Sequence, residues 1–203
     1  MAASLSLFLR AFIIGISIAA PVGPIGVLCI RRTLANGKLA GFLSGMGAAS
    51  ADMIYGAAAA FGVSAITSVL IEHTFWLRLF GGGFLLYLGV RTFLEKPAGQ
   101  AAQTRQGGLF SMYFSTFLLT IANPMTILSF AAIFAGTMIG QETGSPLIMV
   151  AGVFAGSAAW WLTLSLGIGA FRERLTPAHM AWINRISGIV ITAFGLFALI
   201  GGN

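Results

Sequence analysis

Six long apolar segments, separated by short stretches that carry almost every charge, constrain this chain more than any other feature of its sequence. A helix needs about 20 apolar residues to cross the hydrocarbon core of a bilayer. Only 8% of the 203 residues are charged, whereas about a quarter are charged in an ordinary soluble domain. We therefore predict an all-α integral membrane protein with six transmembrane helices, forming one domain over residues 1–203. The predicted spans are residues 11–30, 39–62, 76–94, 109–137, 146–171 and 183–200.

The basic residues are distributed unequally between the two sides of this arrangement. The stretches around the ends of the first, third and fifth spans share one side and hold nine of the eleven Lys and Arg residues. The positive-inside rule makes that side cytoplasmic, so both termini are predicted outside. If Arg10 instead held the N-terminus inside, the first apolar segment would not span the membrane.

The two halves of the chain resemble each other, which indicates an internal repeat. The stretch around Pro24 resembles that around Pro124, 100 positions later, and two further matches lie 107 positions apart. A duplicated unit of three spans must enter the membrane upside down the second time, so we predict an inverted 3+3 repeat of residues 1–94 and 109–203. The two further matches are residues 45–51 with 152–158, and Arg78 with Arg185.

Prolines interrupt the first and fourth spans at matching positions of the repeat. Proline removes an amide donor and disfavours helix at the preceding residue. Backbone left unpaired at membrane depth is tolerated only against protein or a water-filled cavity, and paired broken helices hold the substrate in many transporters. A simple kink is the alternative for either break alone, but their pairing favours a substrate site. The candidate substrate-binding residues at the breaks are Pro21, Gly23, Pro24, Gly26, Asn123 and Pro124.

One acidic residue, Asp52, lies inside a predicted span. An ionisable side chain at that depth is expensive unless it faces a cavity or a partner. Desolvation favours the neutral form of a buried acid, so Asp52 could exchange a proton as the site alternates between sides. We predict a coupling or substrate-binding role for Asp52. The alternative is a structural acid bonded to helix ends or hydrated near an interface.

Aromatic residues inside the spans are further candidates for contact with a substrate. Tyr87 and Trp160 are included among the predicted substrate-binding residues, although packing in the bundle core is the commoner role of such side chains and of Trp161. Small residues recur at spacings that suit close helix packing, within one subunit or in a homo-oligomer.

Several classes of function find no support in the sequence. No catalytic motif or paired carboxylates occur, so we do not expect an enzyme, and we expect no cofactor and no metal site. The basic residues form no stripe that would bind nucleic acid. Cys29 is the only cysteine, which excludes an intrachain disulfide.

Taken in order along the chain, several short motifs resemble those of the lysine/threonine exporter family (LysE/RhtB type). The resemblance covers essentially the whole chain. It implies residue roles for Gly23, Pro24, Asp52, Asn123 and Pro124. The motifs are Pro21-Val22-Gly23-Pro24, Gly47 to Asp52, Leu86-Tyr87-Leu88-Gly89, Ala122-Asn123-Pro124 and Asn184-Arg185-Ile186-Ser187-Gly188.

The resemblance implies an inner-membrane transporter that exports amino acids or related zwitterionic metabolites, driven by protons or another ion gradient. The chain departs from the family pattern at two places, since it has Pro-Val-Gly-Pro at the first break and Met125 where the family commonly has lysine. Two alternatives stay open at this point. One is an exporter of metal or inorganic ions on the same scaffold, and the other is a membrane assembly protein that transports nothing.

Overall fold

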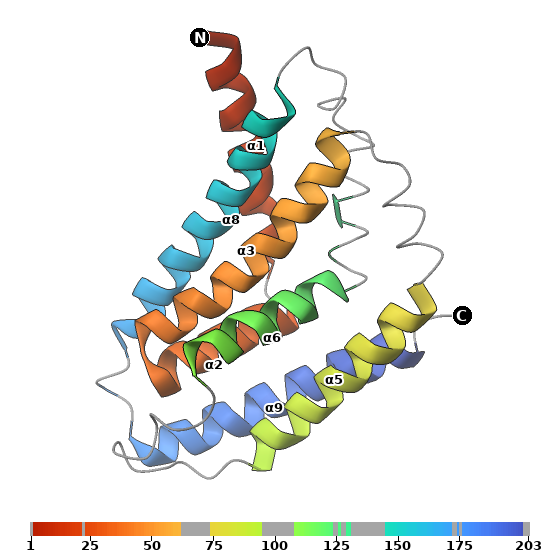
Figure 1. Cartoon of the computed structure of the whole chain (residues 1–203). Helices are drawn as coiled ribbons and strands as arrows, with labels where there is room; N and C mark the ends of the chain where they lie inside the picture. Colours follow the sequence, from red (N-terminus) through yellow and green to blue (C-terminus); the bar gives the residue numbers. More distant parts are fainter. Residues whose placement is uncertain are drawn as a thin grey trace.

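The computed structural model consists of helices throughout the part that it describes (Figure 1). The described residues are 2–21, 23–61, 74–94, 108–123, 126, 129–130, 145–171, 174 and 176–200. Within them, the labelled helices are α1 (Ala2–Ala19), α2 (Pro24–Asn36), α3 (Lys38–Ala60), α5 (Thr74–Leu94), α6 (Leu109–Ile121), α8 (Pro146–Gly169) and α9 (Pro177–Ile200).

The first apolar segment is interrupted where its prolines predict a break. Helix α1 ends at Ala19, α2 begins at Pro24, and the two helices are bent by 82° relative to each other. Gly23 is the N-cap of α2 and Pro24 occupies its first turn, a position at which the missing amide of proline costs no hydrogen bond. The chain then turns tightly from α2 into α3 at Gly37, whose φ of 99° suits glycine.

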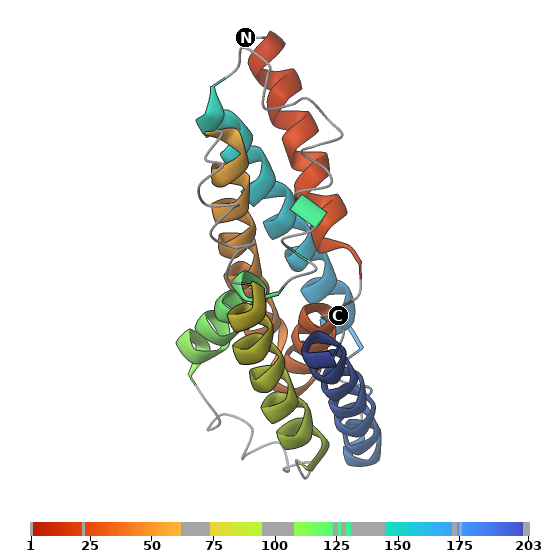
Figure 2. The same cartoon turned by 90° about the vertical axis from the view of Figure 1, so that its right-hand side faces the viewer.

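Close helix packing in one half of the molecule depends on glycine. Helices α1 and α8 run in parallel and lie side by side (Figure 2). A Cβ atom at Gly156 on α8 would overlap the carbonyl oxygen of Phe12 on α1, and one at Gly15 on α1 would overlap that of Val153. On α3, a Cβ at Gly47 would likewise overlap the backbone of α6. Small residues let these backbones approach within van der Waals contact, as is common between membrane helices.

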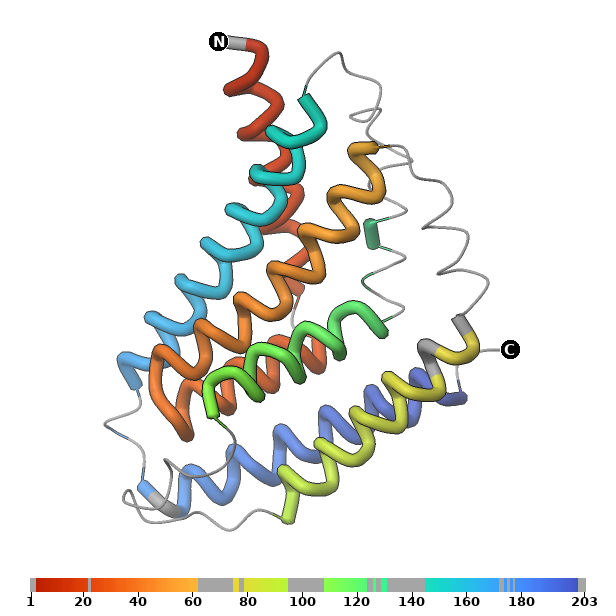
Figure 3. Tube along the Cα trace, in the orientation of Figure 1, coloured from red at the N-terminus to blue at the C-terminus, as the bar shows by residue number. Residues whose placement is uncertain are grey.

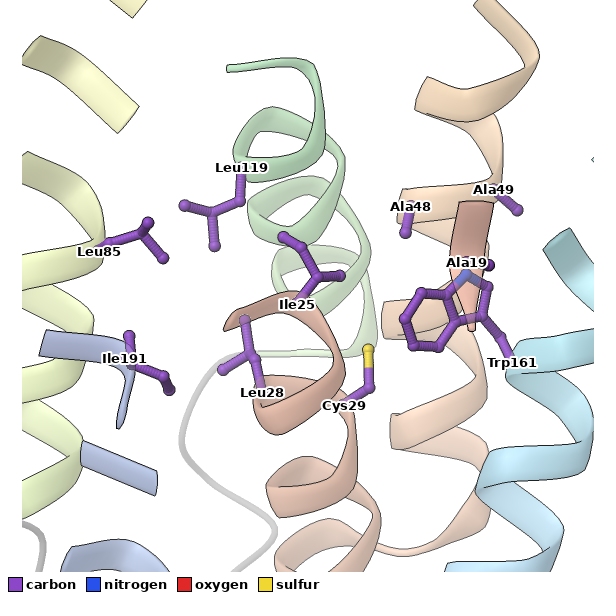
Figure 4. Close-up of a cluster of buried hydrophobic side chains, with 10 residues drawn as sticks. All are labelled: Ala19, Ile25, Leu28, Cys29, Ala48, Ala49, Leu85, Leu119, Trp161 and Ile191. Carbon is purple, nitrogen blue, oxygen red and sulfur yellow. The ribbon is translucent and has the colours of Figure 1, made fainter. Parts of the chain in front are cut away.

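Helices α5 and α9 form a second, antiparallel pair along one side of the molecule (Figure 3). Gly82 and Gly89 on α5 face Gly195 and Gly188 on α9, and a Cβ at any of these four positions would lie within 3.1 Å of the opposite helix. Figure 4 shows how the pair meets the rest of the core, through Leu85 and Ile191 pointing towards α2 and α6.

Large apolar side chains cover the outer faces of the helices. These faces are suited to lipid, because a soluble monomer rarely exposes apolar patches this extensive. By length and apolar composition, two described helices, α8 and residues 178–200 of α9, can each cross a membrane, and the bent α1–α2 pair is a third candidate. The part of the chain that the structure describes is thus helical, with outer faces suited to a membrane. Among the most exposed of these side chains are Phe75, Phe80, Phe110, Trp182 and Phe197.

Candidate functional site

A cavity of about 250 Å³ opens beside the break between α1 and α2. Its wall combines helices that are far apart in the sequence: the end of α1, the start of α2, the middle of α3 and α8, the end of α6 with the stretch that follows it, and α9. Most of the wall is apolar, with polar groups at a few places, which is typical of small-molecule sites. The described lining residues are Ile18, Ala19, Pro21, Gly23, Pro24, Ile25, Gly26, Ala48, Asp52, Thr120, Asn123, Thr126, Ser129, Trp161 and Phe194.

The N-terminus of α2 forms one side of the cavity. The amides of Ile25 and Gly26 have no acceptor within the helix, because the first hydrogen bond of α2 runs from the amide of Val27 to the carbonyl of Gly23. No side chain caps this end of α2. Both residues line the cavity, so the partial positive charge of a helix N-terminus faces it.

Asp52 supplies an acidic group on the wall formed by α3. Its side chain is 3% exposed. The Ser157 hydroxyl on α8 donates a hydrogen bond to Asp52 Oδ2 at 2.7 Å. The Trp161 indole, one turn further along α8, donates to Ser157 Oγ at 3.2 Å. Asp52 is the only acidic residue within the described part of the chain. Ser157 holds it by a hydrogen bond and is itself held by Trp161.

Polar side chains at the end of α6 and directly after it also line the cavity. Helix α6 stops at Ile121, and the carbonyl of Asn123 then accepts a hydrogen bond from the amide of Thr126 at 3.1 Å. Thr120, Asn123 and Thr126 all line the cavity. The predicted second break therefore contributes Asn123 to the same cavity as the first, while Pro124 and Met125 lie outside the described residues.

The structure brings most of the predicted site residues together, but not the two aromatic ones. Tyr87 on α5 is 56% exposed and stacks on Phe84, and neither it nor Trp160 is among the described residues that line the cavity. Trp161 lines it instead, and in Figure 4 its indole lies beside Ala19 and Ala48. Room for that indole is provided by Gly45, where a Cβ would overlap the Trp161 side chain.

Arg32 is a buried basic residue that sequence reasoning placed among the charges at span ends. It lies within α2 and is 8% exposed. It donates to Ser44 on α3 at 3.0 Å, to Thr116 on α6 at 2.8 Å, and to Ser115 and the Met112 carbonyl on α6, each at 2.8 Å. Arg32 thus ties the half-helix beside the cavity to both neighbouring helices. The sequence could have indicated these partners only through the serine and threonine residues of the following apolar segments. Such residues are too common to identify the partners of one arginine.

An interrupted helix whose start faces an internal cavity, in a chain with lipid-facing helices, is typical of membrane transport proteins. The comparison with known proteins agrees. The chain belongs to the LysE type translocator family, whose model matches residues 16–202. The members of this family are translocators rather than enzymes.

Two relatives extend the comparison. The chain is 27% identical over 199 residues to the "Putative amino acid efflux protein YcgF" of Bacillus subtilis (strain 168), covering 95% of each chain. It is 27% identical over 172 residues to the "Uncharacterized membrane protein YahN" of Escherichia coli (strain K12), covering 82% of this chain and 77% of that protein. No solved structure is significantly similar to the chain.

Proposed function

We infer that this protein is a secondary transporter of the inner membrane that exports amino acids or related small zwitterionic metabolites from the cytoplasm. The observation that carries the inference is the cavity, where an acid and a helix N-terminus line the same space. An ammonium group suits Asp52, and a carboxylate suits the free amides of Ile25 and Gly26. The name of the Bacillus subtilis relative adds support for amino acids.

The packing of the helices supports an inverted repeat, which would let the site alternate between the two sides. Gly15 on α1 lies against the backbone of Val153 and Ser157 on α8, and Gly47 on α3 lies against that of Tyr113 and Phe117 on α6. The sequence repeat relates residue 15 to residue 115, 100 positions later, and residues 153 and 157 to residues 46 and 50, 107 positions earlier. The first contact therefore corresponds to a contact of residue 115 with residues 46–50. That is the region of the second contact, as an inverted repeat would require, which supports the proposal. Rocking of such halves against each other is a common route of alternating access.

We propose six spans with both termini outside, because an inverted repeat of three spans leaves the two termini on the same side of the membrane. The basic residues around the α2–α3 junction, Arg31, Arg32 and Lys38, would then lie towards the cytoplasm. Labelling of single cysteines added at either terminus with a membrane-impermeant thiol reagent tests the orientation. Labelling of intact cells at both ends is expected, and protection of either end would reject it.

Efflux from proteoliposomes tests the transport function directly. Vesicles containing the purified protein are loaded with one radiolabelled amino acid at a time, and efflux is measured with and without an imposed pH gradient. We expect gradient-stimulated efflux of at least one amino acid. Vesicles loaded with Mn²⁺ or Zn²⁺ serve as the comparison, since among the described residues no group of three His, Cys, Asp or Glu side chains could hold a metal ion. Efflux of metal alone would overturn the proposal.

Two variants connect the transport to the cavity. Asn123→Ala is expected to weaken binding of the transported amino acid while the protein still folds and inserts, because the side chain lines the cavity wall. Asp52→Asn is expected to abolish the stimulation by a pH gradient. Full affinity in the first variant would remove Asn123 from the site, and unchanged gradient-driven efflux in the second would remove Asp52 from coupling.

A further inference from the structure

The hydrogen bonds around Asp52 determine which of its two oxygens can interact with a ligand. An indole nitrogen can only donate, so Ser157 Oγ must accept from Trp161. The single hydroxyl proton of Ser157 is then directed to Asp52 Oδ2. This leaves Oδ1, to which no hydrogen bond is made within the described part of the chain, as the oxygen of this cavity-lining residue that a ligand can use.

Among the described residues that line the cavity, no positive side chain balances a negative charge on Asp52. None of the described lining residues is basic. The stretch 124–144, whose described members Thr126 and Ser129 line the cavity, contains no Lys, Arg or His in its sequence. Arg32, the nearest buried cation along α2, uses its donors on α3 and α6. A buried carboxylate without a partner is costly, so Asp52 needs either a bound proton or a cation from the ligand.

We propose that a proton and the ammonium group of the substrate compete for the same atom, Oδ1 of Asp52. When the zwitterionic amino acid binds, the neutral carboxylic acid of Asp52 gives its proton to solvent and the resulting carboxylate pairs with the ammonium group. One proton leaves for each substrate that binds, and one proton returns when the substrate leaves. Ser157, which Trp161 orients, is a positioning residue, because it occupies Oδ2 in both states and confines the exchange to one oxygen.

This competition rests on the proposed function and deepens it into a mechanism of exchange. A site that holds either a proton or the substrate, but not both, moves them in opposite directions as it alternates between the two sides of the membrane. Amino acid efflux would therefore be driven by proton entry without a second acidic residue in the site. The same logic predicts that the substrate must carry a cationic amine, so an amino acid whose amines are all acetylated would not be bound.

Within the described residues, the other titratable groups near Asp52 make hydrogen bonds elsewhere or do not line the cavity. The Tyr55 hydroxyl donates to the Ile121 carbonyl, and Tyr113 donates to Ser50. Helix α8 contains no titratable residue. The titratable or charged residues on the elements around Asp52 are Lys38 and Tyr55 on α3, Cys29, Arg31 and Arg32 on α2, Tyr113 on α6, Arg10 on α1, and His179 and Arg185 on α9.

Proton release on binding is the decisive measurement. The purified full-length protein in detergent is titrated with L-leucine, L-threonine or L-lysine by calorimetry, in two buffers that differ in ionisation enthalpy, which counts the protons released. For an amino acid that binds, we expect close to one proton released at low pH and an affinity that falls about tenfold per pH unit there. Asp52→Asn should release none and lose the pH dependence. The derivative of the same amino acid with every amine acetylated, including the side-chain amine of lysine, should fail to bind.

A pair of serine variants tests the positioning role. Ser157→Ala frees Oδ2 and removes a hydrogen bond from the charged form of Asp52. Substrate affinity near neutral pH should therefore fall roughly tenfold, which is the effect of one hydrogen bond to a charged group. The pH midpoint of substrate binding should also move upward. Ser50→Ala is the matched control on α3, since Ser50 bonds Met46 and Tyr113 and does not line the cavity. It should behave as wild type. An unchanged pH midpoint in Ser157→Ala would remove Ser157 from the mechanism.

The outcomes separate this proposal from the proposed function. Binding of an amino acid with no proton release and no pH dependence would overturn the competition and leave amino acid export intact. Proton release that persists in Asp52→Asn would assign the exchange to another group and equally overturn it. If neither binding nor efflux of any amino acid is detected, the proposed function fails and the competition fails with it.

Discussion

The close approach of α1 and α8 can be tested with one pair of glycine substitutions on the same helix. At Gly156, an added Cβ would overlap the Phe12 carbonyl oxygen and would lie 2.9 Å from the Phe12 carbonyl carbon and 3.1 Å from the Ile16 amide nitrogen. These are backbone atoms of α1, which cannot rotate away as a flexible side chain could. At Gly167, near the C-terminal end of α8, an added Cβ would meet no atom within 4 Å.

The expected magnitude follows from the comparison of the two variants. Both changes to Ala gain the same helix propensity, about 1 kcal/mol in water, so that gain cancels between them. The remaining difference is the overlap at Gly156, which overpacking data put at about 1–3 kcal/mol. Gly156→Ala should therefore unfold at a temperature several degrees below Gly167→Ala, at roughly 2–4 °C per kcal/mol for a chain of this size.

Thermal unfolding of both purified variants in the same detergent, followed by size-exclusion chromatography after heating, gives the measurement. Wild type serves as the reference, and Gly167→Ala should match or exceed it. Equal unfolding temperatures for Gly156→Ala and Gly167→Ala would refute the reasoning, because α1 and α8 could then not be as close as the structure has them.

Three further predictions concern the residues around the cavity. Arg32→Lys should lower thermal stability by about 1–3 kcal/mol, because one ammonium cannot reproduce the fork of a guanidinium; unfolding at the wild-type temperature would contradict this. Trp161→Phe should weaken amino acid binding in calorimetry whereas Trp160→Phe should not, since only the former lines the cavity; equal effects would argue against the assigned wall. Gly23→Ala should fold normally, because the φ of −106° at this position suits alanine and the added Cβ would have no atom within 4 Å. The variant should bind substrate less well, because the ligand is expected to approach this backbone. Unchanged affinity would place the ligand elsewhere.

The all-helical membrane fold and the location of the first break were predictable from sequence. Apolar segments of about 20 residues require helices in lipid, because every backbone group must be hydrogen-bonded within the segment. Prolines at positions 21 and 24 interrupt the helix whatever its tertiary contacts are, because the missing amide is a property of the proline residue itself. Asp52 was equally visible, because one acid within an apolar segment needs no structure to be noticed. The six spans and the inverted repeat stay predictions.

The partners of Asp52 were decided by tertiary packing alone. Ser157 lies 105 residues away from Asp52, and it is the register between α3 and α8 that brings the two side chains into contact. Gly45 lies in the same interface, and its missing side chain leaves room for Trp161. Helical periodicity indicates which residues share a face of one helix, but it carries no information about which residues of a second helix lie opposite.

The burial of Arg32 shows the same division between local and tertiary information. Its position at the edge of an apolar segment indicated a charge on the cytoplasmic side, and nothing local distinguishes it from Arg31. Only the crossing of α2, α3 and α6 provides the hydroxyl and carbonyl oxygens that make its burial possible. The sequence by itself determined that this chain is a helical membrane protein with an interrupted first segment and an internal acid. Tertiary structure decided which side chains surround that acid, because contacts between helices follow from packing geometry and not from spacing along the chain.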